Sequence, residues 1–269
     1  RDRSPSRGLG DVYKRQKVIT ANLNGFRSAA RKGLWAYLAK EDPDFLCCQE
    51  LKAQESNLEE VDKNPLGMHR IWHCAEKRGY SGVALYSKQP PQHVQIGLSL
   101  PQFNVEGRYI CADFKKFSLV CLYLPSGTSS NDRQQVKFQF LNYFSTVLSE
   151  LRACGREVLI CGDWNIAHTP LDLKNWRSNQ KHSGFLPEER AWLTEVLEAG
   201  WVDVWRQLYP DIPGYTWWSN RGQAYAKDVG WRIDYQIASP KLAKSAKNAF
   251  VYKEEKFSDH APLVVNYAW

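Results

Sequence analysis

The sequence predicts an α/β fold in which two packed, mixed β-sheets are flanked by helices. Short β-rich runs recur along the chain, and amphipathic helical segments lie between several of them. The runs 108–114 and 118–124 follow one another almost directly, which argues against the strict strand–helix alternation of a doubly wound sheet. Because no linker or repeat interrupts residues 17–269, we expect them to form one domain.

The expected strands are runs of β-branched, aromatic and other apolar residues that end at polar or turn-forming residues. They are 18–22, 44–49, 81–87, 108–114, 118–124, 157–163, 232–238 and 263–267. Helices are expected where apolar residues follow the helical period, around 34–38 and 140–151. A third helix should begin at Pro187, because proline suits the first turn and Glu188 and Glu189 complement the positive end of the helix dipole.

Residues 1–16 differ from the rest of the chain. They are rich in Arg, Ser and Gly, show no apolar period, and stop abruptly before Lys17-Val18-Ile19. We interpret them as a disordered leader or a non-native extension that stability and activity do not require. They contain no apolar run of the kind found in secretory signals.

Composition excludes several classes of protein. Apolar residues make up 43% of the 269 residues, too many for a disordered chain. No segment approaches 18 consecutive apolar residues, so we expect no membrane span. The net charge of +7 permits a polyanionic partner, although it suits an ordinary basic protein equally well.

The number of cysteines is odd, and none has the paired spacing of a metal site. They are Cys47, Cys48, Cys74, Cys111, Cys121, Cys154 and Cys161. Most lie in apolar runs, so we predict buried free thiols in a reducing compartment, which favours a cytoplasmic location.

Five polar clusters stand at the ends of apolar runs, where a sheet presents its site residues. They are 22–27, 49–52, 161–168, 230–235 and 257–263. Each has an ordinary interpretation: Glu50 as a solvated acid at a strand end, Asn22 and Asn24 as turn residues before Gly25. Likewise, Asp259-His260 on its own would more often be a local hydrogen bond than a catalytic pair.

Taken together, the clusters share one chemical logic. They supply carboxylates, amide groups and one imidazole from widely separated positions. Carboxylate and amide oxygens are hard ligands suited to Mg²⁺, and a carboxylate beside a histidine can orient it and tune its basicity. This set is what metal-assisted phosphodiester hydrolysis requires.

With these motifs the sequence resembles the exonuclease III and AP endonuclease family of the endonuclease/exonuclease/phosphatase superfamily. The likeness runs from Lys17 to the C-terminus, holds all five clusters in the family's order, and includes the segments 75–82 and 122–125. It is closer to bacterial members that lack a long N-terminal extension. The resemblance implies a DNase I-like, four-layer α/β sandwich. It also implies a DNA-repair nuclease that hydrolyses phosphodiester bonds 5′ to abasic sites and removes 3′-blocking groups or 3′-terminal nucleotides.

The resemblance also implies roles for the cluster residues. The expected metal ligands or near neighbours of the metal are Asn22, Glu50, Asp163, Asn165, Asp259 and His260. Asp163 would activate the attacking water, Asn165 would position it or stabilise the pentacovalent state, and Tyr123 would lie against the scissile phosphate. Asp234 would orient His260, which would contact the phosphate. Whether Asp163 or His260 is the base, and whether one or two metals act, stays open.

For DNA binding, the resemblance places Arg27, Lys52 and Tyr80 near the phosphate backbone. The aromatic and apolar residues Trp217, Trp231 and Ile233 would line a pocket for a flipped-out abasic sugar. Without the resemblance, core packing explains the tryptophans of Tyr215-Thr216-Trp217-Trp218 equally well.

Two positions depart from the family pattern. Ser126 stands where the family has an asparagine, and His182 stands where several relatives have one. Because the second loop lies near the lesion in the family, the balance of endonuclease, 3′ exonuclease and 3′ phosphatase activity stays open.

The expected cofactor is Mg²⁺, with Mn²⁺ able to replace it. The expected partner of this monomer is double-stranded DNA with abasic sites or damaged 3′ ends. One alternative is a phosphatase or phosphodiesterase of the same superfamily acting on inositol phosphates or sphingomyelin. Another is a non-catalytic nucleic-acid-binding regulator, which the retention of all the polar clusters disfavours.

Overall fold

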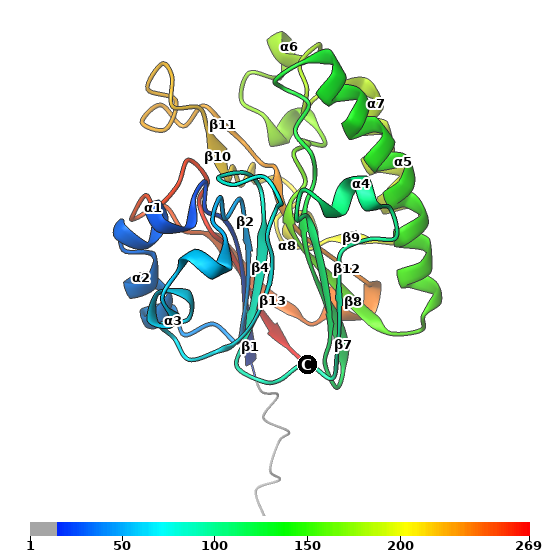
Figure 1. The fold of residues 1–269 in the computed structure, drawn as a ribbon. Coiled ribbons are helices and arrows are strands. Elements are labelled where there is room, and N and C mark those ends of the chain that lie inside the picture. Colours follow the sequence, from blue (N-terminus) through cyan, green and yellow to red (C-terminus); the bar gives the residue numbers. More distant parts are fainter. Residues whose placement is uncertain (1–14) are drawn as a thin grey trace, which may run out of the picture.

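The computed structural model describes residues 15–269, and two six-stranded sheets pack against each other at its centre (Figure 1). The first sheet has the order β13 (Ala246–Val251), β14 (Leu263–Ala268), β1 (Arg15–Asn22), β2 (Phe45–Gln49), β4 (Val83–Ser87) and β3 (His69–His73). The second has the order β5 (His93–Ile96), β6 (Tyr109–Asp113), β7 (Phe117–Tyr123), β8 (Glu157–Asp163), β12 (Asp234–Ala238) and β9 (Val202–Asp203).

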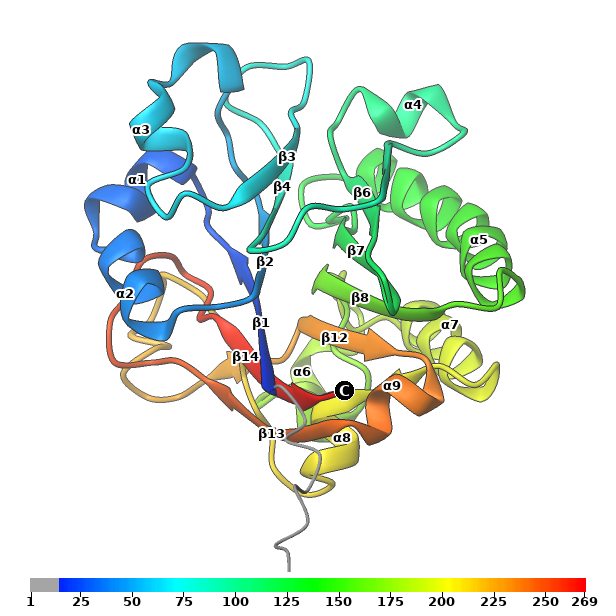
Figure 2. The ribbon, with the colours of Figure 1, turned by 90° about the horizontal axis from the view of Figure 1, so that it is seen from below.

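Both sheets are mixed. The β1–β2 and β7–β8 pairs are parallel, and the other pairs are antiparallel. A separate two-stranded ribbon, β10 (Trp217–Trp218) with β11 (Gly230–Trp231), stands at one end of the sheets. The other end carries the C-terminus, as the view from below shows (Figure 2).

Helices cover the outer face of each sheet (Figure 1). On the first sheet lie α1 (Phe26–Arg31), α2 (Leu34–Glu41) and α3 (Glu60–Lys63); on the second lie α4 (Pro101–Asn104), α5 (Asn131–Ala153) and α7 (Pro187–Glu198). The short helices α6 (Trp176–Asn179), α8 (Val204–Leu208) and α9 (Pro240–Lys244), with 3-10 turns at Glu55–Asn57 and Pro170–Asp172, complete the elements. The expected four-layer α/β sandwich is therefore confirmed.

Strand periodicity divides the core into three layers. In β1, Val18 packs between the sheets, whereas its neighbour Ile19 packs under the helices of the first sheet. In β7, Leu119 and Val120 divide in the same way between the central core and the layer under α5. Alternate residues of a strand point to opposite faces, so strands that are apolar on both faces become the central ones.

All eight expected strands are present, with bounds that differ by up to three residues. The strands that the sequence did not predict are β3, β5, β9, β10, β11 and β13. Strands β3, β5, β9 and β13 lie at the edges of the sheets, and β10 and β11 contain two residues each. Edge and two-residue strands bury little surface, so they carry weak alternation.

The three expected helices are α2, α5 and α7. Helix α5 begins at Asn131, well before the predicted apolar stripe, because the Ser130 side chain accepts a hydrogen bond from the Arg133 amide and caps it. Among residues 15–269, no helix combines the length and the apolar character that crossing a bilayer requires.

The N-terminal boundary differs from the expected one. Residues 1–14 of the expected leader lie outside the described part of the chain. Arg15 and Gln16 belong to β1, where they pair with Ala268 and Tyr267 of β14.

All seven cysteines are free, and five of them are buried as predicted. Cys74 is only half-buried, and Cys154 is exposed because it follows the last turn of α5.

Candidate active site

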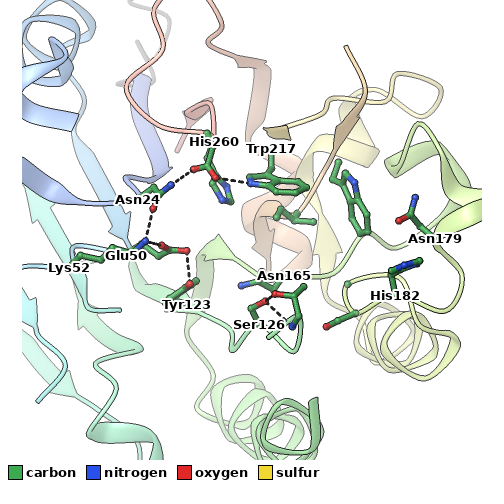
Figure 3. A pocket seen from close by; sticks show the side chains of 16 residues that line it. Asn24, Glu50, Lys52, Tyr123, Ser126, Asn165, Asn179, His182, Trp217 and His260 are labelled. Atoms are coloured by element: carbon green, nitrogen blue, oxygen red, sulfur yellow. Dashed lines mark hydrogen bonds and ion pairs between the residues drawn. The ribbon is translucent and has the colours of Figure 1, made fainter. Parts of the chain in front are cut away.

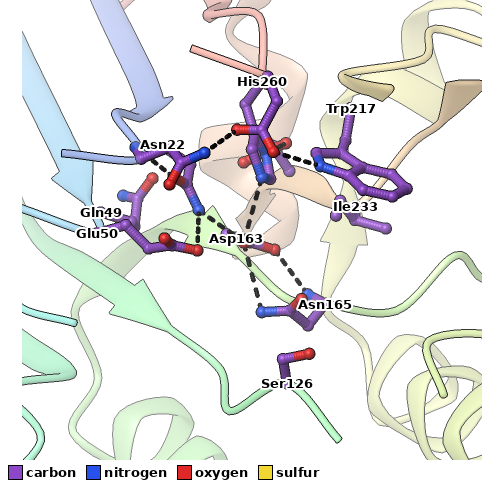
Figure 4. A network of polar contacts seen from close by, with 12 residues as sticks. Asn22, Gln49, Glu50, Ser126, Asp163, Asn165, Trp217, Ile233 and His260 are labelled. Carbon is purple, nitrogen blue, oxygen red and sulfur yellow. Dashed lines mark hydrogen bonds and ion pairs between the residues drawn. The ribbon is translucent and has the colours of Figure 1, made fainter. Parts of the chain in front are cut away.

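The polar clusters meet at one end of the two sheets, on the side where β10 and β11 stand (Figures 1 and 4). The pairing registers explain this. Asn22, the last residue of β1, is aligned with Gln49 at the end of β2, directly before Glu50. Asp163, the last residue of β8, is aligned with Tyr123 of β7 and Asp234 of β12. Strand ends in register bring groups distant in sequence to one edge.

Glu50 is the centre of the first half of the site. Its Oε1 accepts a hydrogen bond from the Tyr123 hydroxyl at 2.6 Å and from the Asn22 amide at 3.2 Å, and its Oε2 lies 2.7 Å from Lys52 Nζ. Burial by itself would raise the pKa of Glu50, but the bond and charge of Lys52 and the Tyr123 hydroxyl lower it overall. Glu50 is therefore a carboxylate held in one orientation.

The second half of the site is built on Asp163, Asp234 and His260. Asp234 Oδ2 lies 2.8 Å from His260 Nδ1 and also accepts a hydrogen bond from Thr216, so it fixes the imidazole. His260 Nε2 points toward Asp163, with 3.9 Å to Oδ2. Burial alone would lower the pKa of His260, but the charges of Asp234 and Asp163 outweigh it and raise the pKa to about 10. His260 is thus an imidazolium at neutral pH.

Asp163 is a buried carboxylate whose surroundings favour its protonated form. Burial, and then the negative charge of Asp234, raise the pKa of Asp163 to about 7. Its Oδ2 accepts a hydrogen bond from the Asn22 amide at 2.9 Å, and its Oδ1 accepts one from the backbone of Asn165 at 2.8 Å. A buried carboxylate whose pKa lies near neutral pH can exchange a proton, and a cation beside it would stabilise its charged form.

The donor set suits a hard divalent cation. Among the described His, Cys, Asp and Glu residues, Glu50, Asp163 and His260 form a group whose ligand atoms lie within 4.8 Å of one another. Asn22 contacts both carboxylates through its amide (Figure 4). Asp259 is not in this group but lines the same cavity, and its oxygens accept hydrogen bonds from Asn24 at 2.8 Å and Trp217 Nε1 at 3.1 Å. Carboxylate and amide oxygens are the ligands that Mg²⁺ and Mn²⁺ prefer.

Asn165 connects the acidic cluster to the loops around it. Its backbone has a φ of 50°, and its side-chain amide donates to the Leu124 carbonyl at 2.8 Å. A positive φ is uncommon outside glycine, but asparagine tolerates it better than most residues. This conformation leaves the side chain at the edge of the cavity, next to Asp163.

The acidic cluster opens into a cavity of about 430 Å³ with an aromatic wall (Figure 3). Trp217 and Trp231 are cross-strand partners in the β10–β11 ribbon, and their rings meet edge to face at 6.0 Å. Ile233 completes the apolar side. The remaining rim is polar and includes Ser126 and His182, the two positions that depart from the family pattern. One cavity thus joins a charged centre to an apolar wall.

A buried ionic network, which the sequence did not reveal, supports this wall. Arg232, between Trp231 and Ile233, donates to Asp172 at 2.7 Å and to Asp203 at 2.7 Å. Burial alone would raise the pKa of Asp172, but Arg232 and then Arg206 outweigh it and lower the pKa to about 2. In the sequence, only the presence of Arg232 within the predicted strand 232–238 pointed to this network, because its partners Asp172 and Asp203 are far away in the chain.

The expected DNA contacts divide into two groups. Lys52 lines the cavity, where its ammonium lies against Glu50 and Asn24. Arg27 and Tyr80 do not line it. Arg27 is exposed on α1, and the half-buried Tyr80 accepts hydrogen bonds from Arg108 at 3.1 Å and Arg133 at 3.0 Å.

Comparison with known proteins agrees with this geometry. The family model described as endonuclease/exonuclease/phosphatase family matches residues 19–260. An exodeoxyribonuclease of Bacillus subtilis is 38% identical over 254 residues, covering 93% of this chain and 99% of its own length. The DNA repair nuclease APEX1 of Danio rerio is 38% identical over 258 residues, covering 93% of this chain and 81% of its own.

Solved structures give the same result. A 3′ phosphatase from Neisseria bound to a product DNA hairpin has a TM-score of 0.86 at 27% identity, covering 94% of this chain and 100% of that chain. An AP endonuclease from Archaeoglobus fulgidus has a TM-score of 0.85 at 28% identity, with the same coverage. These likenesses confirm the expectation of a DNA-repair nuclease, and the chain belongs to the endonuclease/exonuclease/phosphatase family, among its exodeoxyribonuclease and AP endonuclease members.

Proposed function

We propose that this protein hydrolyses phosphodiester bonds of duplex DNA on the 5′ side of abasic sites and removes blocking groups or nucleotides from 3′ ends. The observation that carries the proposal is the joining of an acidic cluster and an aromatic wall in one cavity. Trp217 Nε1 donates to Asp259, whose neighbour in sequence is His260, so the wall is fixed directly to the chemical centre. A superfamily phosphatase acting on a small soluble phosphoester would not need this wall.

A divalent cation, Mg²⁺ or Mn²⁺, would be held by Glu50 and Asn22, with Asp163 beside them. When bound, it supplies positive charge that offsets the phosphate and polarises its oxygens. A cation suits this site because the negative charges of Asp163 and Asp234 repel each other, and that repulsion contributes to the raised pKa of Asp163. A positive ion beside Asp163 would offset this repulsion. The side chain of Asn22 would turn its oxygen toward the cation, since an amide can present either atom.

We assign Asp163 as the group that takes the proton from the attacking water. Its raised pKa and its position directly behind Asn165 and His260, which line the cavity, support this role, whereas His260 holds its own proton too strongly to act as a base at neutral pH. His260, oriented by Asp234, then offers a positive N–H to the phosphate, which stabilises charge that grows in the transition state. Asn165 would hold the water, and Tyr123 would contact the phosphate while it fixes Glu50.

The aromatic wall gives a size argument for the substrate. An abasic sugar can enter the space bounded by Trp217, Trp231 and Ile233, whereas a complete nucleotide is larger. Lys52 at the rim, and Arg27 on α1 outside the cavity, would add contacts to the phosphate backbone that do not depend on sequence. We further propose that the protein acts as a monomer in the cytoplasm, and the seven free cysteines support a reducing compartment.

The test uses end-labelled duplexes that carry one abasic analogue, no lesion, or a 3′-phosphate. With Mg²⁺ we expect incision on the 5′ side of the abasic site and conversion of the 3′-phosphate, and EDTA should abolish both until Mg²⁺ or Mn²⁺ is restored. Full activity after exhaustive chelation would refute the metal site. No cleavage of any duplex with either metal would refute the proposed function.

A further inference from the structure

A buried ion pair that the proposed chemistry does not use lies behind the cavity. Lys137 of α5 and Glu189 of α7 are both 0% exposed, and Lys137 Nζ lies 2.7 Å from Glu189 Oε1. A buried ion pair contributes little net stability, because removing two charges from water offsets their attraction. Such a pair is therefore more informative about what it holds in place than about how stable the fold is.

Lys137 reaches the loop after β8, which carries Asn165. Its ammonium donates to the backbone carbonyl of Asn165 at 2.7 Å. This contact fixes the peptide that follows Asn165, whose φ of 50° turns the chain sharply after β8. The Asn165 amide N–H is fixed by Asp163 on the opposite side. Both ends of this residue are thus held by charged groups.

Glu189 reaches the loop that forms the polar rim of the cavity. Its Oε2 accepts hydrogen bonds from the amides of Gly184 at 2.7 Å and Leu186 at 3.1 Å. The Gly184 carbonyl in turn accepts from Ala167, two residues after Asn165. A side chain at Gly184, whose φ is 91°, would lie 3.2 Å from the Asn165 carbonyl oxygen and 3.1 Å from the Trp231 ring. The two loops therefore contact each other closely at the point where the pair joins them.

We propose that the Lys137–Glu189 pair positions the Asn165 loop against the 182–186 loop, and so sets the turnover rate. This inference rests on the proposed function, in which Asn165 holds the attacking water. Neither charged side chain lines the cavity, so both are positioning residues. Because a misplacement of about 1 Å can cost about 100-fold in rate, loss of the pair should act on kcat more than on DNA binding.

The informative variant removes both charges together. Lys137→Met alone leaves Glu189 buried without a partner, which destabilises strongly. In Lys137→Met/Glu189→Gln the glutamine oxygen still accepts from Gly184 and Leu186, while the methionine cannot donate to the Asn165 carbonyl. Replacing both members of a buried pair is often neutral for stability. This double variant therefore tests the link to Asn165 in a folded protein.

Two controls separate positioning from stability. Lys17→Met/Glu41→Gln removes a partly buried ion pair, with the same 2.7 Å separation, from the opposite end of β1. Leu148→Ala removes core packing on α5 about 16 Å along the helix from Lys137. Leu148→Ala should lower the melting temperature, Lys17→Met/Glu41→Gln should change it little, and both should leave kcat unchanged.

The measurement is kcat and KM on abasic duplex with Mg²⁺, together with thermal melting. We expect kcat of the Lys137→Met/Glu189→Gln variant to fall about 10- to 100-fold, with KM within about threefold of wild type. A kcat equal to wild type in the folded variant, or an equal loss of kcat in either control, would overturn the inference. Failure of the proposed function is distinguishable from failure of this inference, because in that case the wild-type protein itself does not cleave the abasic duplex.

Discussion

Tyr123→Phe should slow cleavage while leaving the fold intact. The hydroxyl of Tyr123 donates to Glu50 at 2.6 Å, and phenylalanine keeps the buried ring and its contact with Arg108, whose guanidinium lies 4.7 Å from the ring centroid. The substitution therefore removes one atom that touches the site. Glu50 keeps its contacts with Lys52 and Asn22 but loses its shortest hydrogen bond.

The magnitude follows from the kind of bond that is lost. A hydrogen bond to a charged group contributes about 1.5–3 kcal/mol. If the Tyr123–Glu50 bond supports the transition state, that range corresponds to a loss of about 10- to 150-fold in kcat/KM. DNA affinity should change little, because the aromatic wall and Lys52 remain in place.

The assay is single-turnover and steady-state cleavage of an abasic duplex in Mg²⁺, with thermal melting measured in parallel. Tyr86→Phe is the matched control, since Tyr86 is also buried and its hydroxyl, away from the site, accepts a hydrogen bond from Trp72 and donates one to the Lys63 carbonyl. This control should lose stability and keep its rate. Wild-type turnover in folded Tyr123→Phe, or an equal rate loss in Tyr86→Phe, would refute the reasoning.

Three further predictions address the base, the wall and the ionic network. Asp163→Asn and His260→Asn should each lower kcat by about 10²–10⁴-fold with little change in DNA affinity, and the double variant should be less than additive; near wild-type turnover in either single variant would remove that residue from the mechanism. Trp231→Ala should slow abasic cleavage and reduce the ratio of abasic to undamaged cleavage, because the wall no longer holds the sugar or excludes a nucleotide; an unchanged ratio in a well-folded variant would assign Trp231 to the core. Asp172 should contribute about 2 kcal/mol of unfolding free energy that is lost as pH falls from 4 toward 2, because Arg232 and Arg206 hold the pKa of this buried group at about 2 against an ordinary 3.8. Because the folded-state pKa is lowered, this contribution is complete only above about pH 5 and falls as pH drops through the folded-state pKa. Urea unfolding across this pH range should show the loss for wild type and not for Asp172→Asn; parallel pH profiles for the two proteins would contradict the argument.

The chemistry of the site could be predicted from the sequence because its residues follow strand ends. Asn22, Glu50 and Asp163 each come at or directly after the end of an apolar run, and the structure brings them together at one edge. The same logic located Asp234, at the start of its strand, and His260. A strand that is apolar on both faces is readable from sequence, and so is the polar residue that ends it.

Some contacts of the site residues could not be predicted from the sequence. Asp259 precedes His260 directly and lines the same cavity, and its carboxylate accepts hydrogen bonds from Asn24 and Trp217. Tyr80 does not line the cavity, and its hydroxyl accepts hydrogen bonds from Arg108 and Arg133. Such contacts depend on how loops far apart in the chain pack together, which local sequence patterns do not encode.

The fold class, the order of the central strands along the chain, and the carboxylate, amide and imidazole groups of the proposed site could be predicted from the sequence alone. These depend on local periodicity and on where an apolar run stops. The ion pairs behind the site, Lys137 with Glu189 and Arg232 with Asp172 and Asp203, became visible only in the folded chain. The physical reason is that a buried charge is stable only beside its partner, and that partner is chosen by packing between loops and helices far apart in the chain.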